Sequence, residues 1–359
     1  MKIAIYSISK NEAKHVKRFM DSVRDADYVY VGDTGSTDNT CDLLVEQGAT
    51  LLVVDVNPWR FDVARNYVLD RLPLDVDVAI ALDLDEIMCF DWRNIIEKAW
   101  EVNNTTRLIY SFVGSHRADG TPDLVFFSKK IHSRFGYEWK YPVHETLYPK
   151  HAFNEIVVGA PDLFIEHFPD HNKPRASYLP LLELSVKENP DNLQHIMYLA
   201  REYFYANRLL EAETLFHDFI RREGWIVERV FCYRMLAKIA KLKGDMDLHY
   251  SMLLKACAEK PTEREPWFDL LEYYYLKAEW WNGIFAAKQG MKIEERPSHY
   301  LTDSNAWGAP FYDLASLCMW NSELIEFRSD AICTCQRALA LCPTDPRLQM
   351  NYEMMNRIS

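Results

Sequence analysis

The stretch VAIALDLDE occupies residues 78–86 and decides how the first half of the chain is interpreted. Its apolar part, residues 78–82, suits a short buried strand, and an acidic cluster follows directly. Along an extended chain, Asp83 and Asp85 project to the same side. Two neighbouring carboxylates at a strand end are costly unless a cation lies beside them. A divalent metal bound to a diphosphate is one such cation, because Mg²⁺ and Mn²⁺ prefer carboxylate and phosphate oxygens.

Three further strands are expected before this stretch, at residues 2–8, 28–31 and 51–56. Helical spacing separates them, over residues 12–24 and in a segment that ends near Gln47. Strands that alternate with helices predict a parallel sheet with helical crossovers, whose ligands bind beyond the carboxyl ends of the strands. The Asp33 turn and Asp83 directly follow expected strand ends.

Three polar motifs precede the acidic cluster. Asn11 and Glu12 follow the first strand, Asp33 opens the turn DTGSTDNT after the second, and Arg65 begins a helical segment. A carboxylate at a strand end can accept hydrogen bonds from a base or ribose, and an arginine there suits phosphate. Each motif also has an ordinary explanation, as a capped β-to-α turn or a surface salt bridge.

From about residue 175 the pattern is helical throughout and repeats itself. Seven positions recur 37 residues later and again after 34 more, and in the first copy they are Ile196, Leu199, Ala200, Tyr203, Ala212, Phe216 and Phe219. A looser copy follows an insertion near residues 295–310. The pattern resembles the tetratricopeptide repeat, whose helix pairs stack because no single pair buries its apolar face.

Taken in order, the four N-terminal motifs resemble the inverting family-2 glycosyltransferases of the GT-A fold, in particular the subgroup with a C-terminal tetratricopeptide tail. The resemblance covers nearly the whole chain. It implies an α/β, Rossmann-like nucleotide-sugar domain with a mostly parallel sheet at residues 1–172, and an all-α repeat domain at 173–359. It also implies metal-dependent transfer of a sugar from a nucleotide-diphosphate sugar, with a UDP-sugar favoured, to a hydroxyl-bearing acceptor.

The resemblance further implies roles for individual residues. The nucleotide sugar is expected to contact Ser9, Asn11, Glu12, Asp33, Arg65, Asp83 and Leu84. Asp33 would contact the base or ribose, Arg65 the nucleotide, most naturally its phosphates, and Asp83 the ribose or the metal. Asp85 would ligate the metal, either Mn²⁺ or Mg²⁺.

Two later motifs offer a further metal ligand and a base, PVHE at 142–145 and IEH at 165–167. In this fold a late histidine often completes the metal shell, and we expect His167 rather than His144 in that role. Glu145, with His144 beside it, is expected to be catalytic, as the base that deprotonates the acceptor. The Glu-Asp pair that many family members use is not found at the matching place. An alternative for His144 is a core histidine bonded to backbone.

The acceptor is left open by the sequence. Residues 126–140 interleave basic and aromatic side chains, which suits an acceptor-side wall or, equally, an amphipathic strand pair with solvated lysines. Saccharide or protein acceptors are favoured, and a hydroxymethylated pyrimidine in DNA is the alternative. The net charge of −12 weighs against sequence-independent nucleic-acid binding. The repeat domain is expected to bind the acceptor or a protein partner.

Two other functions are less consistent with the sequence. A catalytically dead first domain would leave the repeats as a protein-binding scaffold, but the intact motifs argue against it. A nucleotidyltransferase would carry a glycine-rich loop after the first strand, and residues 7–12 contain no glycine.

The chain is expected to reside in the cytoplasm. Its eight cysteines are scattered without a CxxC pair, which favours free thiols in a reducing compartment. The N-terminus lacks the apolar core of a signal peptide, and no stretch approaches the roughly 20 apolar residues that span a membrane.

Overall fold

A computed structural model describes residues 1–101, 104–117, 119–170 and 178–357. The chain divides into two compact units, Met1–Asn189 and Pro190–Ser359. The domain boundary expected between residues 172 and 173 falls outside the described residues. In the ranges given above, no helix has the length and apolar character needed to cross a membrane.

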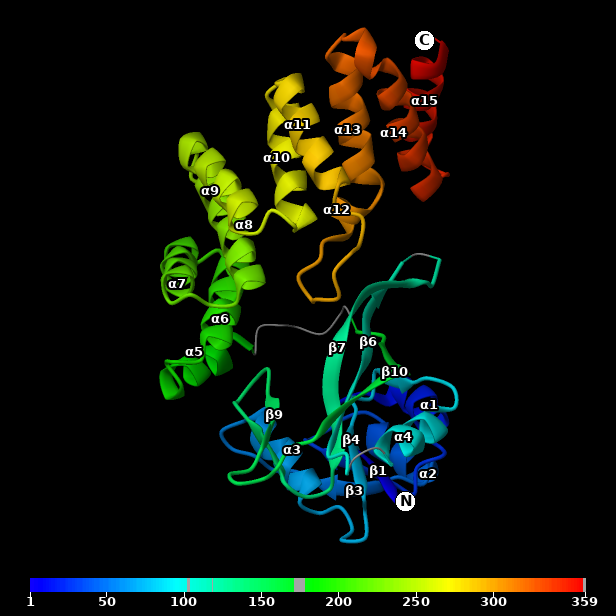
Figure 1. The fold of residues 1–359 in the computed structure, drawn as a ribbon. Coiled ribbons are helices and arrows are strands. Elements are labelled where there is room, and N and C mark those ends of the chain that lie inside the picture. The colour runs from blue at the N-terminus through cyan, green and yellow to red at the C-terminus, as the bar shows by residue number, and fades with distance from the viewer. Residues whose placement is uncertain (102–103, 118, 171–177, 358–359) are drawn as a thin grey trace. The chain divides into compact units, whose positions relative to one another are not determined.

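The first unit combines strands and helices (Figure 1). Its strands are β1 (Ile3–Ser9), β2 (Tyr28–Asp33), β3 (Thr50–Val53), β4 (Val78–Ala81), β5 (Glu86–Met88), β6 (Arg107–His116), β7 (Pro122–Ser133), β8 (Tyr137–Lys140), β9 (Thr146–Pro149) and β10 (Val157–His167). Its helices are α1 (Ala13–Ser22), α2 (Thr40–Glu46), α3 (Phe61–Leu69), α4 (Trp92–Trp100) and α5 (Tyr178–Glu188).

Eight of these strands form one sheet in the order β3-β2-β1-β4-β7-β6-β10-β5. Strands β3, β2, β1 and β4 run parallel, as the alternating pattern predicted. Strand β7 is antiparallel to β4 and β6, and β5 is antiparallel to β10, so the sheet as a whole is mixed. Strands β8 and β9 form a separate hairpin.

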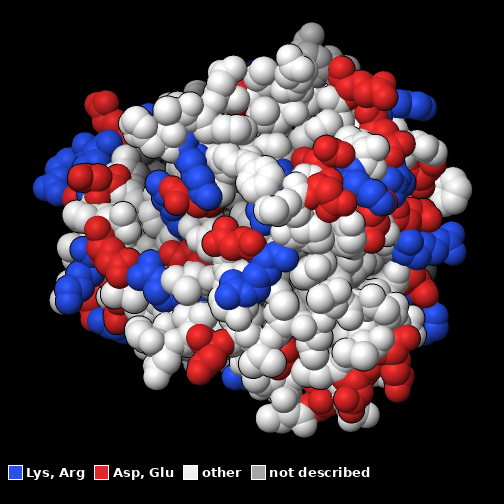
Figure 2. All heavy atoms as spheres, turned by 90° about the horizontal axis from the view of Figure 1, so that it is seen from below, with Lys and Arg blue, Asp and Glu red and all other residues white. Residues whose placement is uncertain are grey.

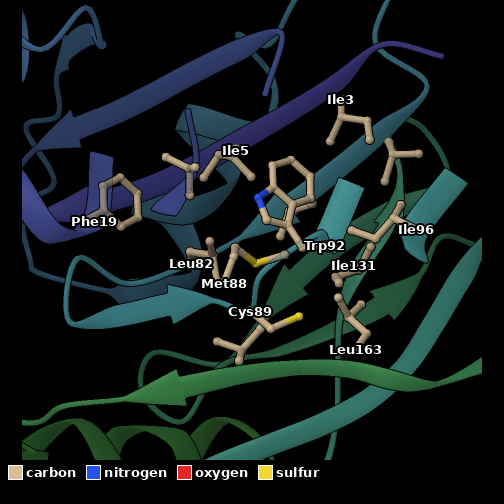
Figure 3. Close-up of a cluster of buried hydrophobic side chains, with 14 of the residues drawn as sticks. Ile3, Ile5, Phe19, Leu82, Met88, Cys89, Trp92, Ile96, Ile131 and Leu163 are labelled. Carbon is tan, nitrogen blue, oxygen red and sulfur yellow. The ribbon is translucent and has the colours of Figure 1, made fainter. Parts of the chain in front are cut away.

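Both faces of the sheet are buried around β1. Ile3 and Ile5 point into a cluster that contains Trp92 (Figure 3), whereas Ala4 and Tyr6 pack on the opposite face. These four side chains of β1 are fully buried. A strand that is buried on both faces has a continuous apolar sequence, which explains why β1 and β4 show no polar alternation.

The second unit is built from helices (Figure 1). They are α6 (Leu193–Tyr205), α7 (Leu209–Arg221), α8 (Ile226–Leu242), α9 (Met246–Glu259), α10 (Arg264–Leu276), α11 (Trp280–Met291), α12 (Ser304–Trp307), α13 (Ala309–Asn321), the 3₁₀ helix η2 (Ile325–Phe327), α14 (Arg328–Leu341) and α15 (Pro346–Arg357).

Successive helices of this unit pack as pairs, α6 with α7, α8 with α9, α10 with α11 and α13 with α14. The predicted repeat positions are mostly core positions, and Leu199, Ala200 and Phe216 are all buried. Small residues allow helices of neighbouring pairs to approach each other closely. A Cβ added at Gly283 would lie 2.6 Å from Sγ of Cys318 on the next pair. The unit is therefore a tetratricopeptide-like helical repeat, as predicted.

Charged side chains of both signs are interspersed on the face of the molecule shown in Figure 2. Lysine and arginine do not gather there into one large basic patch. Sequence-independent binding of nucleic acid needs a basic surface, and the net charge of −12 also argues against such binding.

A buried hydrogen-bonded chain fixes the β8–β9 hairpin to the sheet. Nδ1 of His132 lies 2.8 Å from the Ser133 carbonyl, which can only accept, so Nδ1 carries the proton. Burial lowers the pKa of His132 to about 3, which keeps the ring neutral. The hydroxyl of Tyr6 therefore donates to Nε2 of His132 (2.8 Å) and accepts from Nε1 of Trp139 (2.9 Å).

We predict that Tyr6→Phe lowers the free energy of unfolding by about 1–3 kcal/mol, because it leaves two buried groups without partners. Chemical denaturation followed by near-UV circular dichroism measures the change. Tyr28→Phe is the matched control, since the Tyr28 hydroxyl binds Asp75 at the exposed surface. Equal effects of the two substitutions would contradict the assignment of the buried chain.

Candidate active site

The carboxyl ends of β1, β2, β4 and β10 lie at one edge of the sheet, because these strands run in the same direction. Ser9 ends β1 and pairs with Asp33, which ends β2. Residues 83–85 follow β4, and His167 ends β10 opposite Glu86. Segments distant in the sequence therefore meet at the edge where open α/β sheets bind ligands.

Arg65 joins two of the predicted site residues. Its side chain on α3 is only 7% exposed, and Nη2 lies 2.8 Å from Oδ1 of Asp83. Its Nε donates to Oε1 of Glu145, and its guanidinium lies 5.1 Å from the ring centroid of Trp139. Burial alone would lower the pKa of Arg65, but the charges of Asp83 and Glu145 raise it above its ordinary value. Arg65 is thus a buried, permanently charged link between β4 and the β8–β9 hairpin.

Lys130 on β7 is a second cation at this edge, and its side chain is 21% exposed. Its Nζ lies 2.6 Å from Oε1 of Glu86, and Oε2 of Glu86 accepts a hydrogen bond from the backbone N–H of Asp83 (3.0 Å). Burial alone would raise the pKa of Asp83, whereas the charges of Arg65 and Lys130 lower it to about 2. Asp83 is therefore a carboxylate, and the Lys130–Glu86 pair fixes the turn that carries it.

In the sequence, Lys130 belongs to the basic and aromatic segment 126–140, and its ion pair with Glu86 was not predicted. The one available signal is the alternation along β7, where Lys129 is exposed and Lys130 is partly buried. Alternation shows that Lys130 faces the protein, but only the sheet order places Glu86 beside it.

Asp85 and His167 form the second pair at this edge. Oδ2 of Asp85 lies 3.3 Å from Nε2 of His167, with the two side chains 16% and 29% exposed. The Phe168 backbone N–H donates to the Asp85 carbonyl (2.9 Å), which holds the two segments together. Burial alone would lower the pKa of His167, but Asp85, and then Glu86 and Asp83, raise it above its ordinary value.

The ends of β1 and β2 bind each other closely. Oδ1 of Asn11 accepts from the Thr37 backbone N–H (2.7 Å), and the Glu12 backbone N–H donates to the Thr40 hydroxyl (2.7 Å). Oδ2 of Asp33 accepts from the backbone N–H groups of Gly35 and Ser36, each at 3.0 Å. Asn11, Glu12 and Asp33 thus shape this loop pair, and the Asp33 carboxylate organises its own turn.

The donors and acceptors at this edge fit a metal and a phosphate. Asp85 and His167 offer one oxygen and one nitrogen, which suit Mn²⁺ or Mg²⁺ when phosphate oxygens complete the shell. Over the described residues, no group of three or more His, Cys, Asp or Glu side chains could hold a metal alone. Nη1 of Arg65, Nε2 of His15 and Oγ of Ser9 are buried and have no hydrogen-bond partner within the described part of the chain. Unpartnered buried donors are what an anionic ligand would satisfy.

Two predicted residues lie apart from these pairs. The Leu84 side chain is buried in the apolar cluster of the sheet, so its polar contribution is limited to its backbone. His144 is exposed, has a φ of 48°, and its ring stacks on Tyr178 at 6.1 Å. The alternative that His144 is a core histidine is therefore wrong, because the β8–β9 loop carries it outward.

Several residues of the basic and aromatic segment 126–140 have structural roles. His132, Arg134, Tyr137 and Trp139 are buried, and each makes hydrogen bonds inside the unit. Phe127 on β7 and Phe135 after it are well exposed. The strand-pair interpretation therefore accounts for the buried members of this segment, and these residues cannot form an acceptor-side wall.

Known proteins with similar sequences carry a consistent name, although no protein-family model matches the chain. A Rickettsia felis protein called an uncharacterized glycosyltransferase is 23% identical over 262 residues, which cover 68% of this chain and 90% of that protein. A Rickettsia conorii protein with a similar name is 26% identical over 171 residues, or 46% of this chain. That second match spans 59% of the relative's length.

Several solved structures share part of their fold with this chain at low identity. Yeast Tom70 has a TM-score of 0.39 at 15% identity, covering 53% of this chain and 37% of Tom70. A thermophilic TPR protein from Thermus thermophilus has a TM-score of 0.33 at 18% identity, covering 51% of this chain and 90% of its own. The second unit is assigned as a helical repeat because its successive helices pack as pairs, not because of these similarities.

We predict that His167 in the metal-free protein titrates above pH 6.5, its ordinary pKa, and that Asp85→Asn lowers the midpoint. The charged pair stabilises the fold fully below pH 6.5, and this stabilisation is lost as the pH rises through the raised pKa. NMR titration of the histidine rings measures both midpoints. Asp91→Asn, an exposed change at the α4 N-terminus, should leave the midpoint unchanged. A midpoint at or below 6.5 in the unsubstituted protein would contradict the pairing.

Proposed function

We propose that this protein is a metal-dependent, inverting glycosyltransferase with a GT-A-type N-terminal domain, which moves a sugar from a nucleotide-diphosphate sugar to a hydroxyl group. The observation that carries the proposal is the Asp85–His167 pair, which lies beside the Asp83–Arg65 pair at the ligand edge of the sheet. The glycosyltransferase names of the two distant relatives support the same reaction class.

The donor would occupy the sheet edge. Asp85 and His167 would hold Mn²⁺ or Mg²⁺, which when bound offsets the charge that develops on the leaving diphosphate. The unpartnered Nη1 of Arg65 and Oγ of Ser9 would donate to donor oxygens. Asp33, with Asn11 and Glu12 behind it, would meet the nucleoside, and a UDP-sugar is the first donor to test.

Glu145 is the proposed base. Its Oε1 is held by Arg65, which leaves Oε2 for an acceptor hydroxyl, and its loop also carries the exposed His144. In a single displacement, the acceptor oxygen bonds to the anomeric carbon as the bond to the diphosphate breaks. The hydroxyl proton moves to Glu145. Because Arg65 binds both Glu145 and Asp83, the base is positioned relative to the donor side of the site.

A saccharide or protein remains the favoured acceptor, with a hydroxymethylated pyrimidine in DNA as the second candidate. The burial of His132, Arg134 and Trp139 removes part of the basic and aromatic surface that supported a nucleic-acid acceptor. A catalytically dead scaffold is the remaining alternative, and it predicts that no nucleotide diphosphate binds in calorimetry.

We predict that Asp85→Asn reduces sugar transfer or donor hydrolysis at least about 100-fold, because it removes a metal ligand whose charge supports the leaving group. Mass spectrometry of a panel of nucleotide-sugars and acceptors with Mn²⁺ first identifies the active donor. The same assay then compares the substituted protein with Asp91→Asn as control. Activity in Asp85→Asn equal to that of the control would rule out the metal role.

Glu145→Gln should separate base catalysis from donor binding. Transfer is expected to fall about 10²–10⁴-fold, since an amide cannot accept the proton, while it can still accept the hydrogen bond from Arg65. Calorimetry should find nucleotide-diphosphate affinity within a few-fold of the unsubstituted value. Glu138→Gln, on the same hairpin and paired with Lys140, is the control. Full transfer activity in Glu145→Gln would exclude Glu145 as the base.

A further inference from the structure

The ring of Phe168, the residue that follows the expected metal ligand His167, packs against flat side chains from two other elements. The ring of His116, which ends β6, stacks on it with centroids 4.7 Å apart and planes at 12°. The guanidinium of Arg18 on α1 lies 4.4 Å from the centroid of the same ring. Ring stacking and a cation over an aromatic face are both favourable contacts. Segments from α1, β6 and the end of β10 therefore meet on the Phe168 side chain.

Helix α1 holds the chain after β10 at a second point. Nζ of Lys14 lies 2.5 Å from Oδ2 of Asp170, which follows Phe168 by two residues. Lys14 precedes Arg18 by one helical turn, so both side chains project from one face of α1. Two contacts that are spaced by a helical turn fix the direction of the segment as well as its distance from α1.

The Arg18 guanidinium is held without an acidic partner. In the part of the chain that the structure describes it makes no ion pair, and its Nε has no hydrogen-bond partner there. Its Nη2 lies 3.2 Å from Nδ1 of His15, which accepts because a guanidinium can only donate. The contact with the Phe168 ring and the bond to His15 are therefore the interactions that place this half-buried side chain.

Phe168 passes this constraint on to the metal pair. Its backbone N–H donates to the Asp85 carbonyl (2.9 Å), and His167 is the last residue of β10, where the strand's own pairing ends. Because both the ring and the backbone of Phe168 are held, the main chain at His167 has little freedom to turn. The His167 ring lies 5.9 Å from that of Phe112, with Nε2 3.3 Å from Oδ2 of Asp85.

A metal site with only two protein ligands is sensitive to such positioning. Asp85 and His167 must both lie at bonding distance, since phosphate or water supplies the other ligands. Burial lowers the pKa of His15, whereas Asp85 raises it and Arg18 lowers it, so both charges lie in the same neighbourhood. The positive charge of Arg18 therefore opposes a bound cation. A positioning role for its contact with Phe168 accounts for an arginine at this place.

We propose that Arg18 and His116 are positioning residues, which orient His167 for the metal through the ring of Phe168. The inference rests on the metal role that is proposed for Asp85 and His167. Arg18 and His116 act through Phe168 and not by touching the metal or the substrate. Ordinary packing is the alternative, and it predicts effects on stability without a matching effect on metal binding.

Titration of the full-length protein with Mn²⁺ alone, with free Mn²⁺ measured by electron paramagnetic resonance, tests the proposal. Phe168→Leu removes the ring and should weaken Mn²⁺ binding about 10-fold, the lower end of the losses that follow changes behind metal ligands. Phe168→Tyr keeps the ring and should bind Mn²⁺ within about 2-fold of the unsubstituted protein. His116→Ala removes one of the two partners and should weaken binding about 3-fold.

Arg18→Ala separates positioning from charge. Loss of a positive charge near the site would by itself favour a bound cation, whereas loss of the ring contact should weaken Mn²⁺ binding about 3-fold. Arg24→Ala is the matched control for the charge, because Arg24 is exposed in the turn after α1. Phe127→Leu is the control for the ring, because Phe127 is exposed on β7. Both controls should bind Mn²⁺ like the unsubstituted protein.

Thermal melting of each variant reports on folding, and weaker binding in folded Phe168→Leu that Phe168→Tyr restores supports the proposal. Equal Mn²⁺ binding by the unsubstituted protein and Asp85→Asn would reject the metal role, and the positioning role with it. Binding that Asp85→Asn abolishes but Phe168→Leu and Arg18→Ala leave unchanged would overturn the positioning role alone, as would tighter binding in Arg18→Ala. If Phe168→Leu does not fold, Arg18→Ala and His116→Ala decide by the same criteria.

Discussion

The buried guanidinium of Arg65 is the interaction on which the arrangement of the site depends. A cation removed from water is stable only when carboxylates and hydrogen bonds replace its hydration, and Asp83 and Glu145 do so from two different segments. Loss of either carboxylate would leave a buried charge partly unpaired. This electrostatic constraint fixes the β8–β9 hairpin over the end of β4, and it explains why a loop residue such as Glu145 has a defined position.

Consecutive side chains after β4 point to opposite faces of the sheet. Asp83 faces α3 and its arginine, whereas Leu84 turns into the apolar cluster on the other face. The Lys130–Glu86 pair then closes the turn from β7. Arg65 and Lys130 therefore both hold this turn, and Asp85 is left to pair with His167 at the end of β10.

The two units obey different packing rules. In the first, strands such as β1 are buried on both faces, and polar residues gather where the strands end. In the second, helix pairs stack through small residues, and Gly283 allows a contact that a Cβ would block. The first arrangement concentrates charged groups at one edge, and the second leaves pockets between neighbouring helices, such as the one lined by α8, α9 and α10.

The sequence by itself determined the order of the first strands, the helical repeats and the residues that end β1, β2 and β4, because hydrophobic periodicity and strand-end polarity are local properties. It also named Asp85 and His167 together, as the two expected ligands of one metal. It could not pair Lys130 with Glu86, nor join Arg65 to Glu145, because these contacts depend on β7 inserting beside β4 and on the β8–β9 hairpin folding back over α3. The burial of Trp139 and the exposure of His144 likewise follow from the tertiary structure, since alternation along a strand gives two faces but does not say which one the rest of the chain covers.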